Sequence, residues 1–253
     1  MEDIYIDRLS LYRGKPFEIC DGIKIHPPTL NEICIYGESK YYSMVHMLCS
    51  VGIDFCWQLE EIGIPFDEIS DYMLFCKLLS RQYTSDDTKI LFGEKLDFSK
   101  MKMYTDKNNC TFLLQEENCK TDEQIIIDED AYFKLVAYLR EIHNLKRDNR
   151  IAGTKSCRKA FIEDAKMEYE AKKNEEPTSI LFPMISSMVN IEGFKRNDTT
   201  VWDMNIYAFM DSVKRISKIR NSTLLLQSGY SGFGIDLSKM KNKDELDYMG
   251  ELK

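Results

Sequence analysis

Cysteine and histidine are the residues of this chain with the most readily assigned chemistry, because they bind metals and act as nucleophiles or bases. There are eight cysteines and three histidines, the latter at His26, His46 and His143. None of them falls into a CxxC, HxxxH or HExxH spacing, and the closest cysteine pair, Cys49 and Cys56, lies on apolar segments. The pattern predicts packed free thiols rather than a metal centre, and we expect no metal and no other cofactor.

The sequence does not indicate a nucleophilic active site either. It contains no GxSxG turn, and no serine or cysteine lies in a recognisable turn context near a histidine. His143 falls near the end of an expected helix beside Arg140, Lys146 and Arg147, where a cationic cluster would stabilise the helix C-terminus. We therefore expect no catalytic residues and a protein that is not an enzyme.

A glycine-rich stretch, SGYSGFG at 228–234, invites comparison with phosphate-binding loops. It is neither GxxxxGK[ST] nor a GxGxxG that opens a helix after a strand. The stretch instead predicts a loop in which the chain reverses, with Tyr230 and Phe233 either packed or presented outward.

Two basic zones stand out on a chain whose net charge is −8. One lies at 140–159, and the other, at 214–220, contains Lys214, Arg215, Lys218 and Arg220. A solvated face and a dock for an acidic protein partner both fit these zones. Nucleic acid is the least favoured partner, because the whole chain is acidic and aromatic residues do not alternate with the charges.

The last quarter of the chain is therefore where we expect an interface. The segment NIYAFMDSVKRISKI, at 205–219, separates an apolar from a polar helical face, so it fits either core packing or the binding of a partner in a groove. The candidate interface residues are Trp202, Tyr207, Lys214, Arg215, Lys218, Tyr230 and Phe233.

The elements that must position these residues indicate an α+β fold. We expect a mostly helical protein with a small antiparallel sheet or hairpins in its N-terminal half and a helical C-terminal part. A mixed region at 1–150 and a mainly helical region at 151–253 are expected, with a soft boundary, a second break at the NEEPTS linker (174–179), and a single domain as the alternative.

Individual elements follow from local patterns. Asp21-Gly22 between two short apolar runs predicts a hairpin with a type I′ turn. Helices are expected at 29–37, 40–51, 55–62, 66–83, 129–147, 157–174, 180–189 and 201–219. The runs KILFG, KMKMYTD, CTFLLQ and QIIID predict strands.

The N-terminal residues and the hydropathy of the chain bear on its cellular location. The N-terminus MEDIYIDRLS lacks the apolar segment of an export signal, and no apolar run approaches the ~20 residues that span a bilayer. We expect a cytoplasmic protein that does not enter a membrane.

Several blocks resemble an uncharacterised protein family of tailed bacteriophages and prophages of Firmicutes. The similar blocks are PPTLNEICIYGESKYYSMV, QLEEIGIPFDEISDYMLF, DTKILFGEKLDFSKM, SILFPMISSMVN, VWDMNIYAFMDSVKRISKI and DELDYMGEL. The resemblance implies a protein of the virion-morphogenesis region, in tail assembly, acting as a chaperone near the tape-measure step. It carries over no functional residues.

Three non-enzymatic functions remain open on this resemblance. The first is a tail-assembly protein that binds other phage proteins of the tail or tape-measure type. The second is a structural component of the tail or connector in the mature virion. The third is an accessory factor that binds a host protein, such as an anti-defence inhibitor. The expected location is the host cytoplasm or the virion, and the oligomeric state stays open.

Overall fold

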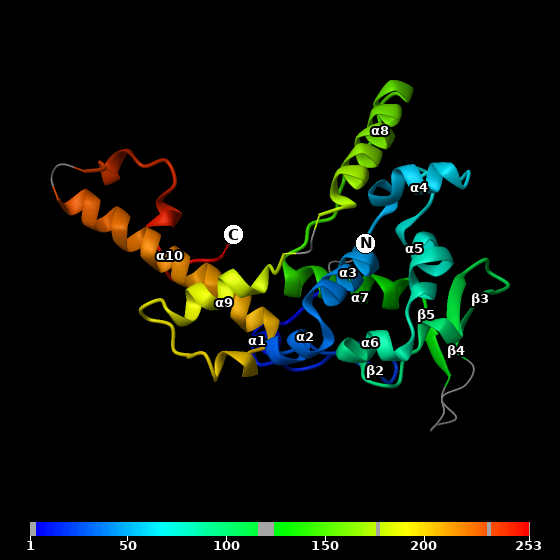
Figure 1. Ribbon diagram of the computed structural model, residues 1–253, viewed down its shortest axis with the longest axis horizontal. Helices are drawn as coiled ribbons and strands as arrows, with labels where there is room; N and C mark the ends of the chain where they lie inside the picture. The colour runs from blue at the N-terminus through cyan, green and yellow to red at the C-terminus, as the bar shows by residue number, and fades with distance from the viewer. Residues whose placement is uncertain (1–3, 116–123, 176–177, 232–233, 253) are drawn as a thin grey trace. The chain divides into compact units, whose positions relative to one another are not determined.

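The computed structural model describes residues 4–115, 124–175, 178–231 and 234–252 (Figure 1). It divides into two compact units: Met1–Pro28 with Glu32–Ser179, and Thr29–Asn31 with Ile180–Lys253. The expected α+β class is confirmed, since helices dominate and two small antiparallel sheets lie in the N-terminal half. The division adjoins the 174–179 linker, whereas residue 150 lies inside unit 1.

Unit 1 begins with a short helix and the predicted hairpin. After α1 (Arg8–Tyr12), strands β1 (Phe17–Cys20) and β2 (Ile23–Ile25) pair antiparallel. The expected type I′ turn is wrong, because that turn needs positive φ at both central residues and only Gly22, at φ 74°, has it. The ladder is irregular between Glu18 and Cys20, which accommodates the different turn.

Apart from α6, which the sequence did not predict, the helices of unit 1 after α1 follow the predicted order with shifted ends. They are α2 (Leu30–Tyr36, whose first two residues belong to unit 2), α3 (Glu38–Cys49), α4 (Cys56–Glu61), α5 (Asp71–Leu74), α6 (Ser85–Phe92), α7 (Glu129–His143) and α8 (Lys155–Lys172). The helix expected at 66–83 begins later, because Ser70 caps it by accepting the N–H of Met73. It continues as a π-helical turn, Phe75–Leu79, and a 3-10 turn, Ser80–Gln82.

The strand expected at KILFG is wrong, since these residues lie in α6. An apolar run of this length fits a buried strand or a buried helix equally well. The capping residues at its ends therefore determine which of the two forms. The Asp87 carboxylate accepts hydrogen bonds from the N–H and hydroxyl of Thr84, at 3.0 and 2.9 Å. This reciprocal capping starts the helix, and the Lys40 ammonium 2.8 Å away lowers the pKa of Asp87 to about 2.

The three remaining predicted strands form one sheet. β3 (Met101–Thr105), β4 (Thr111–Gln115) and β5 (Ile125–Ile127) pair antiparallel in the order β3-β4-β5. Asn109 adopts φ 63° in the β3–β4 turn, as its residue type allows.

Helix α7 supplies the centre of unit 1. Its predicted stripe is buried, with Leu135 and Leu139 fully inaccessible. The Tyr138 ring stacks on Phe17 of β1 at 5.5 Å, and Tyr132 lies 5.6 Å from Tyr72 of α5. The helix ends at His143 because Asn144 adopts a left-handed conformation, earlier than the expected residue 147.

His143 is not the cation expected at the end of this helix. Its ring lies against Tyr41 and Tyr42 of α3, with centroids 5.4 and 5.7 Å away, and its Nε2 is 2.8 Å from the Tyr41 hydroxyl. Removal from water, and next the charge of His46, lower the pKa of His143 to about 3. The imidazole is therefore neutral at pH 7.

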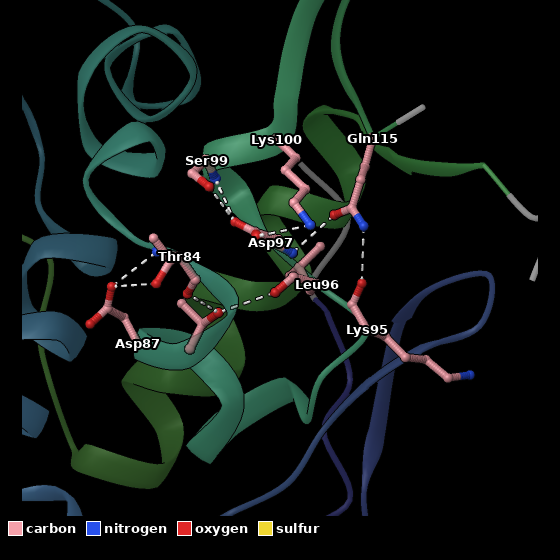
Figure 2. Close-up of polar contacts among 9 residues, drawn as sticks. Thr84, Asp87, Lys95, Leu96, Asp97, Ser99, Lys100 and Gln115 are labelled. Atoms are coloured by element: carbon pink, nitrogen blue, oxygen red, sulfur yellow. Dashed lines mark hydrogen bonds and ion pairs between the residues drawn. The ribbon is translucent and has the colours of Figure 1, made fainter. Parts of the chain in front are cut away.

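A buried amide joins the sheet to the segment that follows α6 (Figure 2). Gln115, at the end of β4, is 3% exposed. Its Oε1 accepts the N–H of Asp97 at 2.9 Å, and its Nε2 donates to the carbonyl of Lys95 at 3.2 Å. The side chain satisfies two main-chain groups that are removed from water, which fixes the chain where it enters β3.

Hydrogen bonds from Thr88 and Ser99 also hold the segment at 95–99. The buried Thr88 hydroxyl lies 3.1 Å from the carbonyl of Thr84 and 3.3 Å from that of Leu96. The Asp97 carboxylate accepts the N–H and hydroxyl of Ser99 at 3.0 and 2.6 Å (Figure 2).

Helix α8 is the exposed helix that its charges predict, with no residue fully buried. It lies beside α4, where Trp57 and Tyr169 approach at 5.2 Å. Arg158 forms ion pairs with Glu60 and Asp67, at 2.8 and 3.4 Å.

Unit 2 contains α9 (Leu181–Val189), a 3-10 turn (Val201–Asp203) and the long helix α10 (Ile206–Tyr230). Asn205 caps α10 by accepting the N–H of Ala208, and it also forms a β-bridge with Thr29. The N–H of Leu30 donates to the carbonyl of Met204 at 2.9 Å. Leu30, Ile206 and Phe209 are fully buried, so the core of this unit lies at the start of α10.

Replacing Gln115 by alanine should lower the free energy of unfolding by about 1–3 kcal/mol, because the N–H of Asp97 and the carbonyl of Lys95 would lose a partner. Urea unfolding followed by circular dichroism measures the change. The exposed Gln82→Ala is the matched control and should stay within about 0.5 kcal/mol of wild type. Equal effects of the two variants would contradict the role given to Gln115.

Acid should destabilise the fold through His143. Its pKa is about 3 in the folded chain and 6.5 ordinarily, so the unfolded chain takes up the proton first and stability falls as pH drops from 6.5 toward 3. Because His143 is half-buried, solvent screening reduces the effect of this shift. We expect the free energy of unfolding to fall by on the order of 2 kcal/mol. His143→Gln, which keeps a hydrogen-bonding partner for Tyr41 but does not titrate, should show a shallower decline in unfolding free energy between pH 6.5 and 4. Parallel declines would disprove the assignment.

Candidate interface on helix α10

The basic zone at 140–159 is largely used inside unit 1. Arg147 binds Asp71 at 2.9 Å, and the Arg140 guanidinium donates to the carbonyl of Cys49 at 2.7 Å. Arg150 pairs with Asp148 at 2.6 Å. These contacts join α7 to α3 and the α7–α8 segment to α5, so this zone is a poor candidate for binding an external partner.

The cysteines that the structure describes are not brought together into a reactive group. The seven described ones are unpaired, and Cys49, Cys56 and Cys76 are buried. Burial raises the pKa of Cys49 to about 12 and that of Cys76 to about 11, so both are protonated and weakly nucleophilic at pH 7. Cys119 lies outside the described residues. Within the described ranges, no group of three or more His, Cys, Asp or Glu side chains could hold a metal ion.

The second basic zone has a different use, on α10 of unit 2. Lys214, Arg215 and Lys218 lie on adjacent turns of this helix and are half-buried. Among the residues that the structure describes, none forms an ion pair or hydrogen bond with the Lys214 ammonium. This part of α10 faces residues 242–252, which follow it in the chain (Figure 1).

Arg215 and Lys218 bind main-chain carbonyls of that following segment. The Arg215 Nη1 donates to the carbonyls of Tyr248 and Gly250 at 2.8 and 2.9 Å, and Lys218 Nζ donates to that of Glu251 at 2.7 Å. Hydrogen bonds from a charged donor are stronger than those between neutral groups. Because a carbonyl belongs to every residue, these contacts recognise a peptide backbone rather than particular side chains.

Ser222 anchors the other end of this segment. Its side chain is fully buried, and its hydroxyl donates to the carbonyl of Glu245 at 2.6 Å. Arg215, Lys218 and Ser222 lie on one face of the helix, since residues three and four apart are neighbours on its surface. The segment therefore runs antiparallel to α10, from Ser222 back towards Arg215.

Two glycines allow this return. A Cβ on Gly229 would lie 2.3 Å from Cγ of Leu237, so Leu237 packs directly against the backbone of α10. A Cβ on Gly234 would lie 2.2 Å from the carbonyl oxygen of Ser228. The predicted reversal is present, but Ser228, Gly229 and Tyr230 belong to the last turn of α10 rather than to a loop.

Between α10 and the returning segment lies an open groove of about 810 Å³. The helix side is lined by lysine, serine and asparagine, and the segment side mainly by acids and amides. The polar lining residues are Lys214, Ser217, Lys218, Asn221, Asn242, Asp244, Glu245, Asp247 and Glu251. Val213 and Leu252 add apolar surface to the lining, so the groove offers the mixed polar and apolar contacts that a peptide makes.

The structure brings three of the predicted interface residues together at the groove, namely Lys214, Arg215 and Lys218. Trp202 is half-buried at the other end of the unit, where its indole N–H donates to the carbonyl of Asp198 at 2.8 Å. Tyr207 is half-buried in the first turn of α10.

Tyr230 is 83% exposed at the last residue of α10, about 18 Å along the helix from Lys218 at 1.5 Å per residue. Phe233 lies outside the described residues.

Ser222 and the acidic residues at 244–251 were not among the predicted interface residues. Helical spacing from Arg215 and Lys218 would have placed Ser222 on the same face, had α10 been expected to continue past residue 219. The role of Gly250 had no sequence signal, because its contribution is a main-chain carbonyl.

Comparisons with protein-family models, with curated proteins and with solved structures find no match to this chain. No helix in the described part of the chain is long and apolar enough to cross a membrane.

Replacing Ser222 by alanine should loosen the returning segment, because the carbonyl of Glu245 would lose its buried donor. A loss of about 1 kcal/mol corresponds to roughly fivefold faster amide hydrogen exchange over residues 244–250, measured by mass spectrometry. The adjacent Thr223→Ala is the matched control, since the Thr223 hydroxyl donates to Ile219 within α10. Unchanged exchange in Ser222→Ala would show that this hydrogen bond does not hold the segment.

Proposed function

We propose that this chain is a non-enzymatic morphogenesis protein of a tailed bacteriophage, which acts in tail assembly by binding other phage proteins through unit 2. The observation that carries the proposal is the cationic face of α10, where Arg215 and Lys218 bind peptide carbonyls. A surface that binds a backbone segment of its own chain has the chemistry to bind one from another protein. The sequence blocks that resemble the phage family supply the biological setting.

The contrast between the two basic zones supports this assignment to unit 2. In the basic zone of unit 1, Arg147 pairs with Asp71 and Arg158 pairs with Glu60. On α10, Lys214 extends over an open groove and Arg220 is exposed. Basic side chains on α10 attract acidic segments, and complementary charge speeds the encounter of binding partners. The proposed location is the host cytoplasm during assembly.

Affinity purification from cells in which the encoding phage is assembling tests the proposal. The tagged full chain should recover the tail-tube or tape-measure protein, and Lys214→Ala/Lys218→Ala should recover several-fold less because the groove loses two charges. Lys155→Ala/Lys159→Ala, on the exposed helix α8, is the charge-matched control.

Recovery of neither tail protein by wild type would overturn the proposal. Mass spectrometry of purified virions separates the related alternative: an assembly chaperone should be absent, whereas a structural component would be present at fixed stoichiometry.

A further inference from the structure

The returning segment is bound shallowly to α10. Among the described residues 234–252, no side chain is fully buried, and Tyr248 and Met249 are 51% and 76% exposed. Its attachment includes hydrogen bonds from Arg215, Lys218 and Ser222 to carbonyls, a hydrogen bond from the Ile235 N–H to the Ser228 hydroxyl at 3.1 Å, and the packing of Leu237 on Gly229. A segment held by few buried apolar contacts opens at low free-energy cost.

The contacts follow one face of the helix over a long distance. Positions 215, 222 and 229 of α10 recur every two turns, and they bind the segment at 248–250, at 245 and at 237 in turn. At 1.5 Å per residue this track is about 21 Å long. That length suits a peptide lying along the helix, and the groove of about 810 Å³ beside it is open to solvent.

Charge is complementary along this track. Residues 244–252, DELDYMGEL, contain four acids and no base, whereas the facing part of α10 carries Lys214, Arg215 and Lys218. The segment that covers this face of α10 therefore shows which ligand chemistry the face accepts: an acidic peptide whose carbonyls face the helix.

We infer that the face of α10 that carries Lys214, Arg215, Lys218 and Ser222 is a binding site for an acidic peptide segment of a partner protein, and that residues 244–252 cover this face as a displaceable intramolecular competitor. The inference rests on the proposed role of unit 2 in protein binding and specifies the partner surface. Partner binding would release the chain's own segment from α10, and the anchor at Leu237 sets how strongly that segment competes.

Direct binding of a synthetic peptide to the full chain tests the inference. The probe is fluorescein-labelled DELDYMGEL, followed by fluorescence anisotropy. Wild type should bind weakly, because its own segment is present at high effective concentration. Leu237→Ser removes an anchor outside the probed region, so it should bind the peptide at least about fivefold more tightly. Gly229→Val places a side chain on α10 where Leu237 packs, so it should also tighten binding of the peptide.

Two controls test whether peptide binding depends on the lysines of α10 and on the acidic side chains of the peptide. In the Leu237→Ser background, Lys214→Ala/Lys218→Ala should weaken binding at least about tenfold, and Lys155→Ala/Lys159→Ala should not. The amide peptide NQLNYMGQL should bind more weakly than the acidic one, and the difference should shrink at high salt. Circular dichroism checks that each variant keeps its helix content.

Three results would overturn the inference: no peptide binding to either anchor variant, equal binding of the acidic and amide peptides, or unchanged hydrogen exchange at 244–250 in both anchor variants. The last would show that the segment is not displaceable. If one of these three results were found but the purification experiment still recovered phage tail proteins, the proposed function would stand. Only the peptide-binding site on α10 would be ruled out.

Discussion

Burial of one face of α7 is the constraint on which unit 1 depends. Leu135 and Leu139 are fully inaccessible, and the tyrosines of this helix reach in different directions: Tyr138 to β1 and Tyr132 to α5. Full burial of an aliphatic side chain contributes about 1.5–3 kcal/mol. Since α3, α5, β1 and β5 all pack on α7, each of them gains its burial from the same helix.

Unit 2 is built in another way. Its buried apolar residues gather near the start of α10, at Ile206, Ala208 and Phe209, and along the rest of the helix Ser222 is the buried residue in the described structure. Beyond the first turns, charged and polar groups hold the following segment through its backbone. Polar attachment of this kind gives up little apolar contact when it opens, which is why a binding surface is assigned to this part of the chain.

Much of the fold was accessible from the sequence because the periodic signals were strong. The α7 stripe, the exposed character of α8 and the strands β3, β4 and β5 all follow from residue spacing. The errors arose where spacing does not discriminate. KILFG forms a helix because Thr84 and Asp87 cap it, and His143 is neutral because residues from a distant helix enclose it.

The candidate site was only partly predictable, for a related physical reason. The basic positions Lys214, Arg215 and Lys218 are visible in the sequence, but their occupant binds through carbonyls, which leave no mark on residue type. The extent of α10 was also hidden, because Gly229 near its end suggested a loop. Glycine is needed there for the close approach of Leu237, and the helix accommodates it within its last turn.

Recognition through carbonyls also has an evolutionary consequence. Since Arg215 binds the backbone at Tyr248 and Gly250, substitutions of the outward side chains of Tyr248 and Met249 would leave these hydrogen bonds in place. The segment is thus free to diverge at its exposed positions while keeping its attachment to α10. Changing a few acids of the segment would retune how readily it leaves α10, without rebuilding the helix.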